Sequence, residues 1–105
     1  MDAGALQRTH YERIYDAYER HYYDPTAIRY RERFIYSWLF DGLDLNGKTV
    51  ADLASGSGHN SLAILRRFPG ALVTGFDVSP SACRDYTRNT GRPAVLCDLT
   101  KPIET

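Results

Sequence analysis

The residues best suited to chemistry surround a glycine-rich turn at 55–58. The apolar run TVADLA precedes Gly56 and Gly58, and apolar residues resume after them at helical spacing. Backbone N–H groups at such a strand-to-helix turn bind polar ligand groups, and glycine lets a ligand approach the backbone closely. Asp77 ends a second apolar run 19 residues after Gly58, where a carboxylate accepts hydrogen bonds from ribose hydroxyls. Together these features predict a site for an adenosine-type ligand rather than a purely structural turn.

Two classes of ligand fit a turn of this kind, and Ser61 and Asp52 distinguish them. A dinucleotide site usually has three glycines in the order G-x-G-x-x-G, and Ser61 stands where the third is expected. Asp52 lies inside the first apolar run, where its carboxylate repels a pyrophosphate but suits an ammonium group. The residues therefore favour a ligand with both a ribose and an α-amino acid. The same two residues make a nicotinamide-dependent oxidoreductase the less favoured hypothesis.

An alternating framework is needed to position these side chains. Short apolar runs typical of buried parallel strands occur at 49–54, 71–78 and 93–99. Helical segments separate them: one runs from the turn to Pro69, and the next from Ser79 to Gly91. This order predicts an α/β fold with a parallel sheet covered by helices.

The first 46 residues form a different region, which is rich in tyrosine and in charged residues. Apolar and aromatic residues recur at three- and four-residue steps from Tyr11 to Tyr22, which predicts an amphipathic helix. We therefore divide the chain into a helical segment, 1–46, and an α/β segment, 47–105.

A second helix is predicted within the first segment. Asp24 and Pro25 are typical of a helix cap and first turn, and Gly42 is typical of a helix end. We expect its buried side to carry Ile28, Phe34, Ile35, Trp38 and Leu39. Arg29 and Arg33 share one face, which we interpret as solvated.

Residues 48–99 resemble the N-terminal half of a class I S-adenosylmethionine-dependent methyltransferase. The stretch VADLASGSG is similar to the first motif of that family, FDVSP to the second and VLCDL to the third, in order and at normal spacing. The resemblance implies a Rossmann-like methyltransferase fold, here with a partial parallel sheet of three strands, helices on both faces and an N-terminal helical lid. It also implies S-adenosylmethionine as the cofactor and 47–105 as the cofactor-binding half.

The same resemblance implies roles for individual residues. Asp52 is expected near the amino group of the cofactor's methionine part, and Asp77 is expected to bind the ribose hydroxyls. The backbone is expected to pass beneath the cofactor at Ala54, Gly56 and Gly58. The residues expected around the adenine are Val78, Asp98 and Leu99. Ala54 departs from the commonest family pattern, which has glycine there.

In many small-molecule methyltransferases, N-terminal helices fold over the cofactor and an aromatic residue completes the pocket. By this resemblance Tyr23 is our first choice for that contact, followed by Tyr22 and Tyr15. Each tyrosine also fits a simple packing role between helix and sheet, and this alternative stays open. We interpret His59 as a structural or cofactor-edge residue rather than a catalytic one. The catalytic residue is not identified.

Composition limits the partners. The chain has 105 residues, of which 13 are basic and 13 acidic. It has no apolar run of membrane-spanning length. It also lacks the basic patch that nucleic acid requires, and with the tyrosine-rich lid we expect a small-molecule methyl acceptor. We expect the two cysteines, Cys83 and Cys97, to be reduced thiols rather than a disulfide, and we expect no metal. A cytoplasmic protein is the default expectation.

The sheet of the family has seven strands, and this sequence accounts for three. The first strand is then an apolar edge, which predicts a homo-oligomer or a partner that completes the sheet. Two functions remain open. One is an S-adenosylmethionine-dependent methyltransferase, or the cofactor-binding half of one. The alternative is a non-catalytic module that binds the cofactor or acts through association.

Overall fold

The computed structural model describes residues 3–102. In chain order the elements are α1 (Ala3–Tyr22), α2 (Pro25–Arg31), the π-helical turn η1 (Glu32–Tyr36), α3 (Ser37–Leu39), β1 (Thr49–Leu53), α4 (His59–Arg67), β2 (Leu72–Asp77), α5 (Pro80–Thr90) and β3 (Ala94–Leu96). Within α1 the backbone is described throughout, but eight side chains are not: those of Tyr11, Ile14, Tyr15, Asp16, Ala17, Tyr18, His21 and Tyr22. Our second choices for the lid contact, Tyr15 and Tyr22, therefore lie outside the described residues.

The three strands form one parallel sheet in the order β1-β2-β3. Asp52 of β1 pairs with Gly75 of β2, and Asp77 at the end of β2 pairs with Leu96 of β3. The carboxyl ends of the strands therefore meet at one edge of the sheet, where ligands bind in folds of this kind. β1 is an outer strand, as predicted. The association that we expected from this edge stays a prediction.

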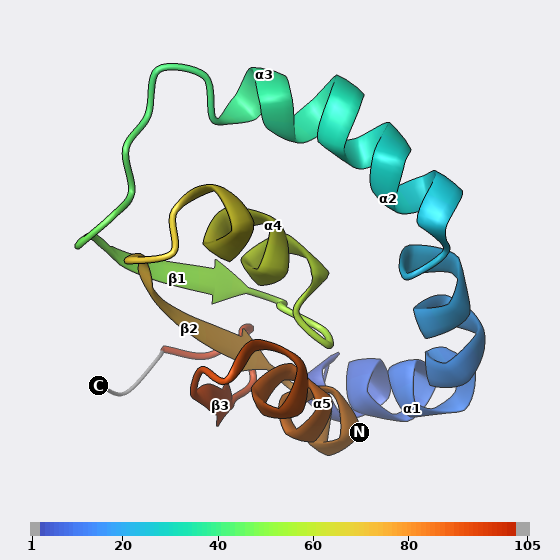
Figure 1. Ribbon diagram of the computed structural model, residues 1–105. Coiled ribbons are helices and arrows are strands. Elements are labelled where there is room, and N and C mark those ends of the chain that lie inside the picture. Colours follow the sequence, from blue (N-terminus) through green and yellow to red (C-terminus); the bar gives the residue numbers. More distant parts are fainter. Residues whose placement is uncertain (1–2, 103–105) are drawn as a thin grey trace.

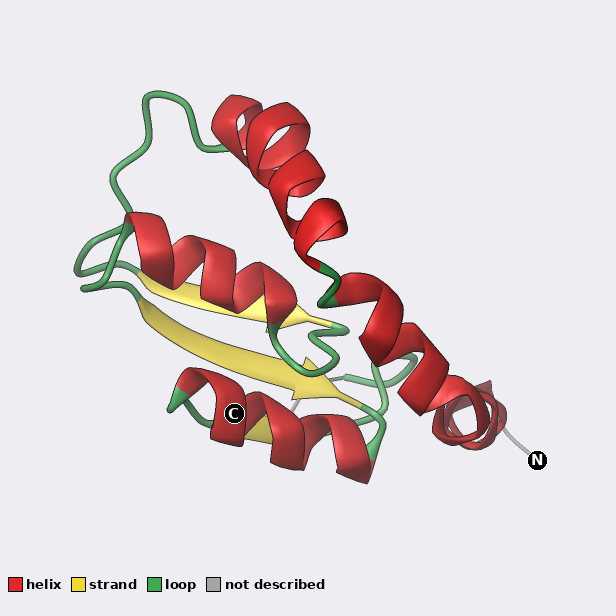
Figure 2. Cartoon of the chain, turned by 45° about the vertical axis from the view of Figure 1, so that its right-hand side comes forward, coloured by secondary structure: helices red, strands yellow, loops and turns green. Residues whose placement is uncertain are grey.

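The crossover helices α4 and α5 lie on the same face of the sheet (Figure 1, Figure 2). Side chains that point to this face are buried, such as Val73 at 2% exposure, whereas Leu53 and Leu72 on the other face are 56% and 54% exposed. The expectation of helices on both faces is wrong in this detail. Both right-handed crossovers step in the same direction, from β1 to β2 to β3, and this places both helices on one side.

Helix boundaries follow the predicted capping residues. The Asp24 side chain accepts a hydrogen bond from the Ala27 N–H at 3.1 Å, and the Ser79 side chain accepts one from Ala82 at 3.2 Å. Gly91 ends α5 with a φ of 70°, a left-handed conformation that glycine adopts without strain. These local signals place the start of α2 and both ends of α5 as expected.

The N-terminal helices form an arc that begins beside α5, passes the carboxyl ends of the strands and continues over α4 (Figure 1). The arc meets α4 through Tyr36, which is 4% exposed and donates a hydrogen bond to Asn60. Glu32 pairs with Arg66 and Arg67, each at 2.8 Å. The residues that make this contact are therefore spaced four apart along one side of the helix.

The predicted buried side of this helix is wrong. Exposed side chains on that side are Phe34, Ile35, Trp38 and Leu39, at 58%, 41%, 78% and 50%. Tyr36 and Phe40 are packed instead, because only their side also brings Glu32 opposite the arginines of α4. Arg29 and Arg33 are exposed, as we interpreted them.

The apolar core lies between the sheet, α4 and the loop that follows α3. Its buried members are Ile64, Phe68, Ala71 and Val73, with Phe40, Leu45, Val50 and Leu65 packed against them. Across the described residues 3–102, the helices lack the length and apolar character needed to cross a membrane.

Candidate functional site

The turn between β1 and α4 is built from left-handed backbone. Ala54, Gly56 and Gly58 have φ angles of 55°, 57° and 101°. A left-handed conformation strains alanine by about 1 kcal/mol and does not strain glycine. This explains why the commonest family pattern has glycine where this chain has Ala54. A Cβ on Gly58 would lie 2.8 Å from Cγ2 of Thr90, so this glycine is required by space as well as by conformation.

The Asp77 carboxylate fastens this turn to the loop after β2. Its Oδ2 accepts a hydrogen bond from the Gly56 N–H at 2.8 Å, and its Oδ1 accepts one from the Ser79 N–H at 3.0 Å. The residue is only 6% exposed. Each carboxylate oxygen accepts about two hydrogen bonds. Asp77 can therefore hold the turn and still accept bonds from ligand hydroxyls.

Asp52 is held from beneath the turn by α4 and α5. The Ser61 hydroxyl donates to Asp52 Oδ2 at 2.6 Å, and the Tyr86 hydroxyl lies 2.8 Å from the same Ser61 oxygen. Burial raises the pKa of Asp52, and the negative charge of Asp77 raises it further. Ser61, which stands where a dinucleotide pattern has a third glycine, thus orients the carboxylate. Spacing within the sequence did not indicate this role.

Ser57, inside the turn, connects it to α1. Its hydroxyl donates to Glu19 Oε2 at 2.5 Å, and its carbonyl oxygen accepts from the Tyr23 hydroxyl at 3.2 Å and the Asn89 amide at 3.1 Å. Burial raises the pKa values of Glu19 and Tyr23. Tyr23, our first choice for the lid contact, therefore lies against the glycine-rich turn.

The same side of α1 reaches the loop after β2. Glu12 accepts hydrogen bonds from the hydroxyls of Ser79 and Ser81 at 2.5 and 2.7 Å, and these bonds lower its pKa. One turn earlier, Arg8 Nε donates to the Val78 carbonyl at 2.8 Å. Val78 is 5% exposed. The helix therefore covers the two residues, Asp77 and Val78, that were assigned to ribose and adenine.

The first turn of α1 lies against the loop after β3. A Cβ on Gly4 would come within 2.0 Å of Asp98 Oδ2, so the backbone of α1 touches this carboxylate. Asp98 Oδ1 accepts from the N–H and hydroxyl of Thr100 at 2.9 and 2.6 Å, which lowers the pKa of Asp98. Leu99 is half-buried beside it.

The structure thus sorts the predicted site residues into two groups. Those that surround the turn itself are Tyr23, Asp52, Ala54, Gly56, Gly58 and Asp77. Those on the next two loops are Val78, Asp98 and Leu99. Sequence reasoning missed Ser57, Glu19, Glu12 and Arg8. The signal was present in the helical spacing of positions 4, 8, 12 and 19, which share one face of α1, and Tyr23 follows on the same side directly after the helix ends.

A pH effect is expected from His59, the first residue of α4. Burial lowers its pKa to about 4, and the charge of Arg31 also lowers it. The pKa of this histidine in the unfolded chain is about 6.5. As the pH falls from 6.5 towards 4, the unfolded chain therefore binds a proton that the folded chain does not, and the free energy of unfolding decreases. In His59→Gln, the loss of unfolding free energy between pH 7 and pH 4.5 should be smaller by about 1 kcal/mol, after discounting for partial exposure.

Urea unfolding of both proteins at a series of pH values measures this difference. His10→Gln provides the matched control, because it removes a histidine that is exposed on α1 rather than partly buried. A His59→Gln variant with the wild-type dependence would show that the imidazole is not held neutral by the fold.

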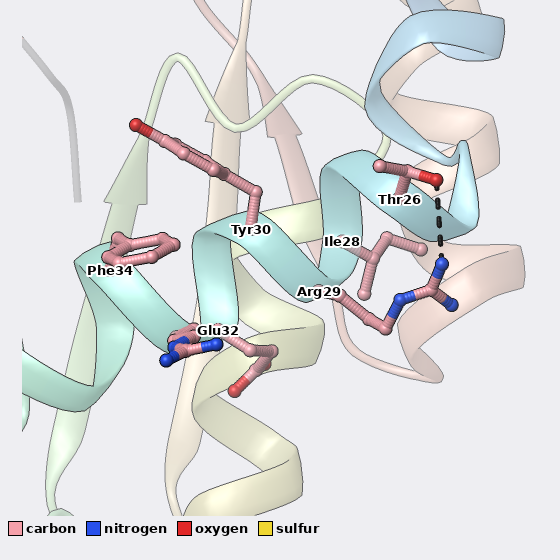
Figure 3. Close-up of a pocket in the computed structure, with 7 residues that line it drawn as sticks. Thr26, Ile28, Arg29, Tyr30, Glu32 and Phe34 are labelled. Atoms are coloured by element: carbon pink, nitrogen blue, oxygen red, sulfur yellow. Dashed lines mark hydrogen bonds between the residues drawn. The ribbon is translucent and has the colours of Figure 1, made fainter.

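A hollow of about 650 Å³ lies away from the turn, along α2 and η1 (Figure 3). Its lining consists of Thr26, Ile28, Arg29, Tyr30, Glu32, Arg33 and Phe34. Figure 3 shows Arg29 directed towards Thr26, to which it donates a hydrogen bond at 3.4 Å. The lining belongs to one helical run, whereas the turn gathers side chains from several elements. We therefore place the candidate site at the turn.

The chain resembles known proteins both in sequence and in structure. No family model matches the chain. Over 58 residues the chain is 45% identical to proteins named ribosomal protein L11 methyltransferase from Klebsiella pneumoniae and Citrobacter koseri. The match covers 55% of this chain and 19% of each relative. The chain thus spans only a minor part of the length of these relatives.

A solved structure covers nearly the whole chain. The magnesium protoporphyrin IX methyltransferase of Synechocystis PCC 6803, with bound SAH, matches with a TM-score of 0.75 and 22% identity, over 96% of this chain and 54% of that one. This likeness confirms the Rossmann-like methyltransferase fold. The chain has the fold of the class I S-adenosylmethionine-dependent methyltransferases, and the resemblance carried by its three motifs is confirmed. The named relatives agree with the predicted enzyme class, and the bound SAH of the solved structure agrees with the predicted cofactor.

The expectation of a small-molecule acceptor is wrong. The relatives found by sequence are named for a protein, ribosomal protein L11. The absence of a basic patch argued against nucleic acid but does not distinguish a protein from a small molecule. Tyr23, one of the tyrosines behind this expectation, donates a hydrogen bond to Ser57 in the turn, and this contact does not indicate a particular acceptor.

Proposed function

We propose that this chain binds S-adenosylmethionine and is the cofactor-binding half of a class I methyltransferase. The observation that carries the proposal is the position of Asp77, a buried carboxylate that holds the Gly56 N–H and keeps acceptor capacity for ribose hydroxyls. The carboxylate also stands at the carboxyl end of β2, where ligands bind in folds of this kind.

The residues present fit the proposed cofactor. An ammonium group suits Asp52, and the ribose hydroxyls suit Asp77. The left-handed turn brings backbone rather than side chains against the ligand at Ala54, Gly56 and Gly58. The residues proposed for the adenine are Val78, Asp98 and Leu99. One oxygen of Glu19 is buried without a hydrogen-bond partner among the described residues, which also fits a ligand that brings donors or positive charge.

Bound S-adenosylmethionine supplies a methyl group that its sulfonium has already activated. The tasks left to this chain are therefore binding, orientation and exclusion of water. Asp77 and the turn provide the first two. Helix α1 provides the third, because its contacts with Ser57, Val78 and Ser79 cover the loops at the carboxyl ends of the strands.

We further propose that 1–46 act as a lid over the 47–105 half. Asp77 and Val78 are 6% and 5% exposed beneath α1, so a ligand reaches them only when α1 shifts. Its contacts are hydrogen bonds to serine hydroxyls and carbonyl oxygens, which water can replace at small net cost. Tyr23 belongs to this lid through its bond to Ser57.

Isothermal titration of the chain with S-adenosylhomocysteine tests the proposal. We expect a single site with a Kd on the order of 10 μM, corresponding to about −7 kcal/mol. Titration with NAD⁺ is the control, because a dinucleotide should not bind next to Asp52. Circular dichroism on the same samples establishes that the chain is folded. A folded chain that binds NAD⁺, or that binds neither molecule, would contradict the proposal.

A further inference from the structure

The Glu19 carboxylate is fixed over the glycine-rich turn with one oxygen unused. Its Oε2 accepts the Ser57 hydroxyl at 2.5 Å. Its Oε1 is buried and has no hydrogen-bond partner among the described residues. A buried carboxylate oxygen without a donor is unfavourable, because it has given up its hydrogen bonds to water. The geometry therefore lacks a donor or a cation at this position.

Other carboxylates near the turn add to the negative charge around Glu19. Asp52 and Asp77 interact unfavourably with each other, and Asp85 acts on Glu19 in the same way. Burial and the charge of Asp85 raise the pKa of Glu19. Among the cations of the described residues, Arg8 donates to the Val78 carbonyl and Arg88 is paired with Asp85, whereas the charge of Arg31 acts on Tyr23 and His59. A positive charge placed beside the unpartnered Glu19 oxygen is therefore favourable, and a negative charge there is not.

We propose that Glu19 sets the charge selectivity of the cofactor site, favouring a cationic sulfonium ligand over the neutral thioether that remains after methyl transfer. The inference rests on the proposed function. S-Adenosylmethionine and S-adenosylhomocysteine differ by one methyl group and one positive charge on sulfur. A fixed carboxylate in a partly buried site distinguishes them by that charge. The same residue thereby weakens retention of the product.

The test compares three ligands in wild type and in Glu19→Gln, by isothermal titration of the full chain. The ligands are S-adenosylmethionine, S-adenosylhomocysteine and sinefungin, which carries an amine in place of the methylsulfonium and is cationic at neutral pH. In Glu19→Gln the preference for each cationic ligand over S-adenosylhomocysteine should fall about five- to tenfold. Glutamine keeps an acceptor for the Ser57 hydroxyl, so the turn should remain intact and the Kd of S-adenosylhomocysteine should change little.

Glu12→Gln is the matched control, since it removes a carboxylate from the same helix at the loop after β2. It should change the affinity of all three ligands by a common factor and leave their ratios as in wild type. Unchanged ratios in Glu19→Gln, with binding retained, would overturn this inference and leave the proposed function standing. Failure of the folded wild type to bind any of the three ligands would overturn the proposed function itself.

Discussion

Asp77→Asn is expected to weaken binding of S-adenosylhomocysteine about a hundredfold and to lower the free energy of unfolding by about 2 kcal/mol. The carboxylate accepts one backbone N–H from Gly56 and one from Ser79, at 2.8 and 3.0 Å, in a position that is 6% exposed. Asparagine offers one acceptor oxygen and turns an NH₂ group towards the other N–H. One buried donor is then left without a partner. Of the two acceptor positions proposed for the ribose hydroxyls, one is lost as well, and the one that remains belongs to a neutral amide oxygen.

Urea unfolding and isothermal titration measure the two effects separately. Asp44→Asn is the matched control, because the Asp44 carboxylate also accepts a backbone N–H, that of Asn46 at 3.0 Å, but in an exposed loop. That variant should keep wild-type binding. If Asp77→Asn loses stability yet binds S-adenosylhomocysteine as wild type does, Asp77 only holds the turn and the ribose assignment fails.

Gly75→Ala is expected to lower the free energy of unfolding by about 3 kcal/mol. A Cβ at this position in β2 would lie 2.7 Å from Ser55 Oγ and 2.7 Å from the ring of Tyr86. Neither neighbour can move easily, since Ser55 is 2% exposed and Tyr86 is fully buried. Tyr86 is also bonded to Ser61 beneath the turn. The strain should therefore reach the candidate site.

Circular dichroism during urea unfolding measures this loss. Gly91→Ala provides the comparison: its φ of 70° makes alanine unfavourable by about 1 kcal/mol, but nothing lies within 4 Å of the added Cβ. The double variant Gly75→Ala, Ser55→Ala should recover part of the stability, because it removes one of the overlapping atoms. Equal stability of Gly75→Ala and Gly91→Ala would show that β2 and α5 adjust freely.

Many of the helix and strand positions were predictable because their signals are local. Apolar runs of strand length, the caps at Asp24 and Ser79, and Gly91 after α5 each act on neighbouring residues, and the elements began or ended there. Asp52 and Asp77 were predictable for a related reason. They occupy β1 and the end of β2, and parallel pairing brings such positions together in any sheet of this order.

Packing partners could not be predicted from the same local patterns. The helical run from α2 to α3 carries apolar residues on both sides, so periodicity alone permits either side to be buried. The structure buries Tyr36 and exposes Trp38, because the side with Tyr36 also places Glu32 against Arg66. The prediction also missed that α4 and α5 cover the same face of the sheet. The order of the strands decides which face each crossover helix covers, and local patterns do not give that order.

The lid contacts depended entirely on tertiary structure. Ser57 and Glu19 are 38 positions apart, and nothing in either segment indicates the other. They meet because α1 lies along the carboxyl ends of all three strands, where a single helix face contacts successive loops. Local sequence therefore decided which elements form and which carboxylates end the strands. The long-range path of α1 decided which side chains close the site, since a helix specifies its face but not the surface that the face will cover.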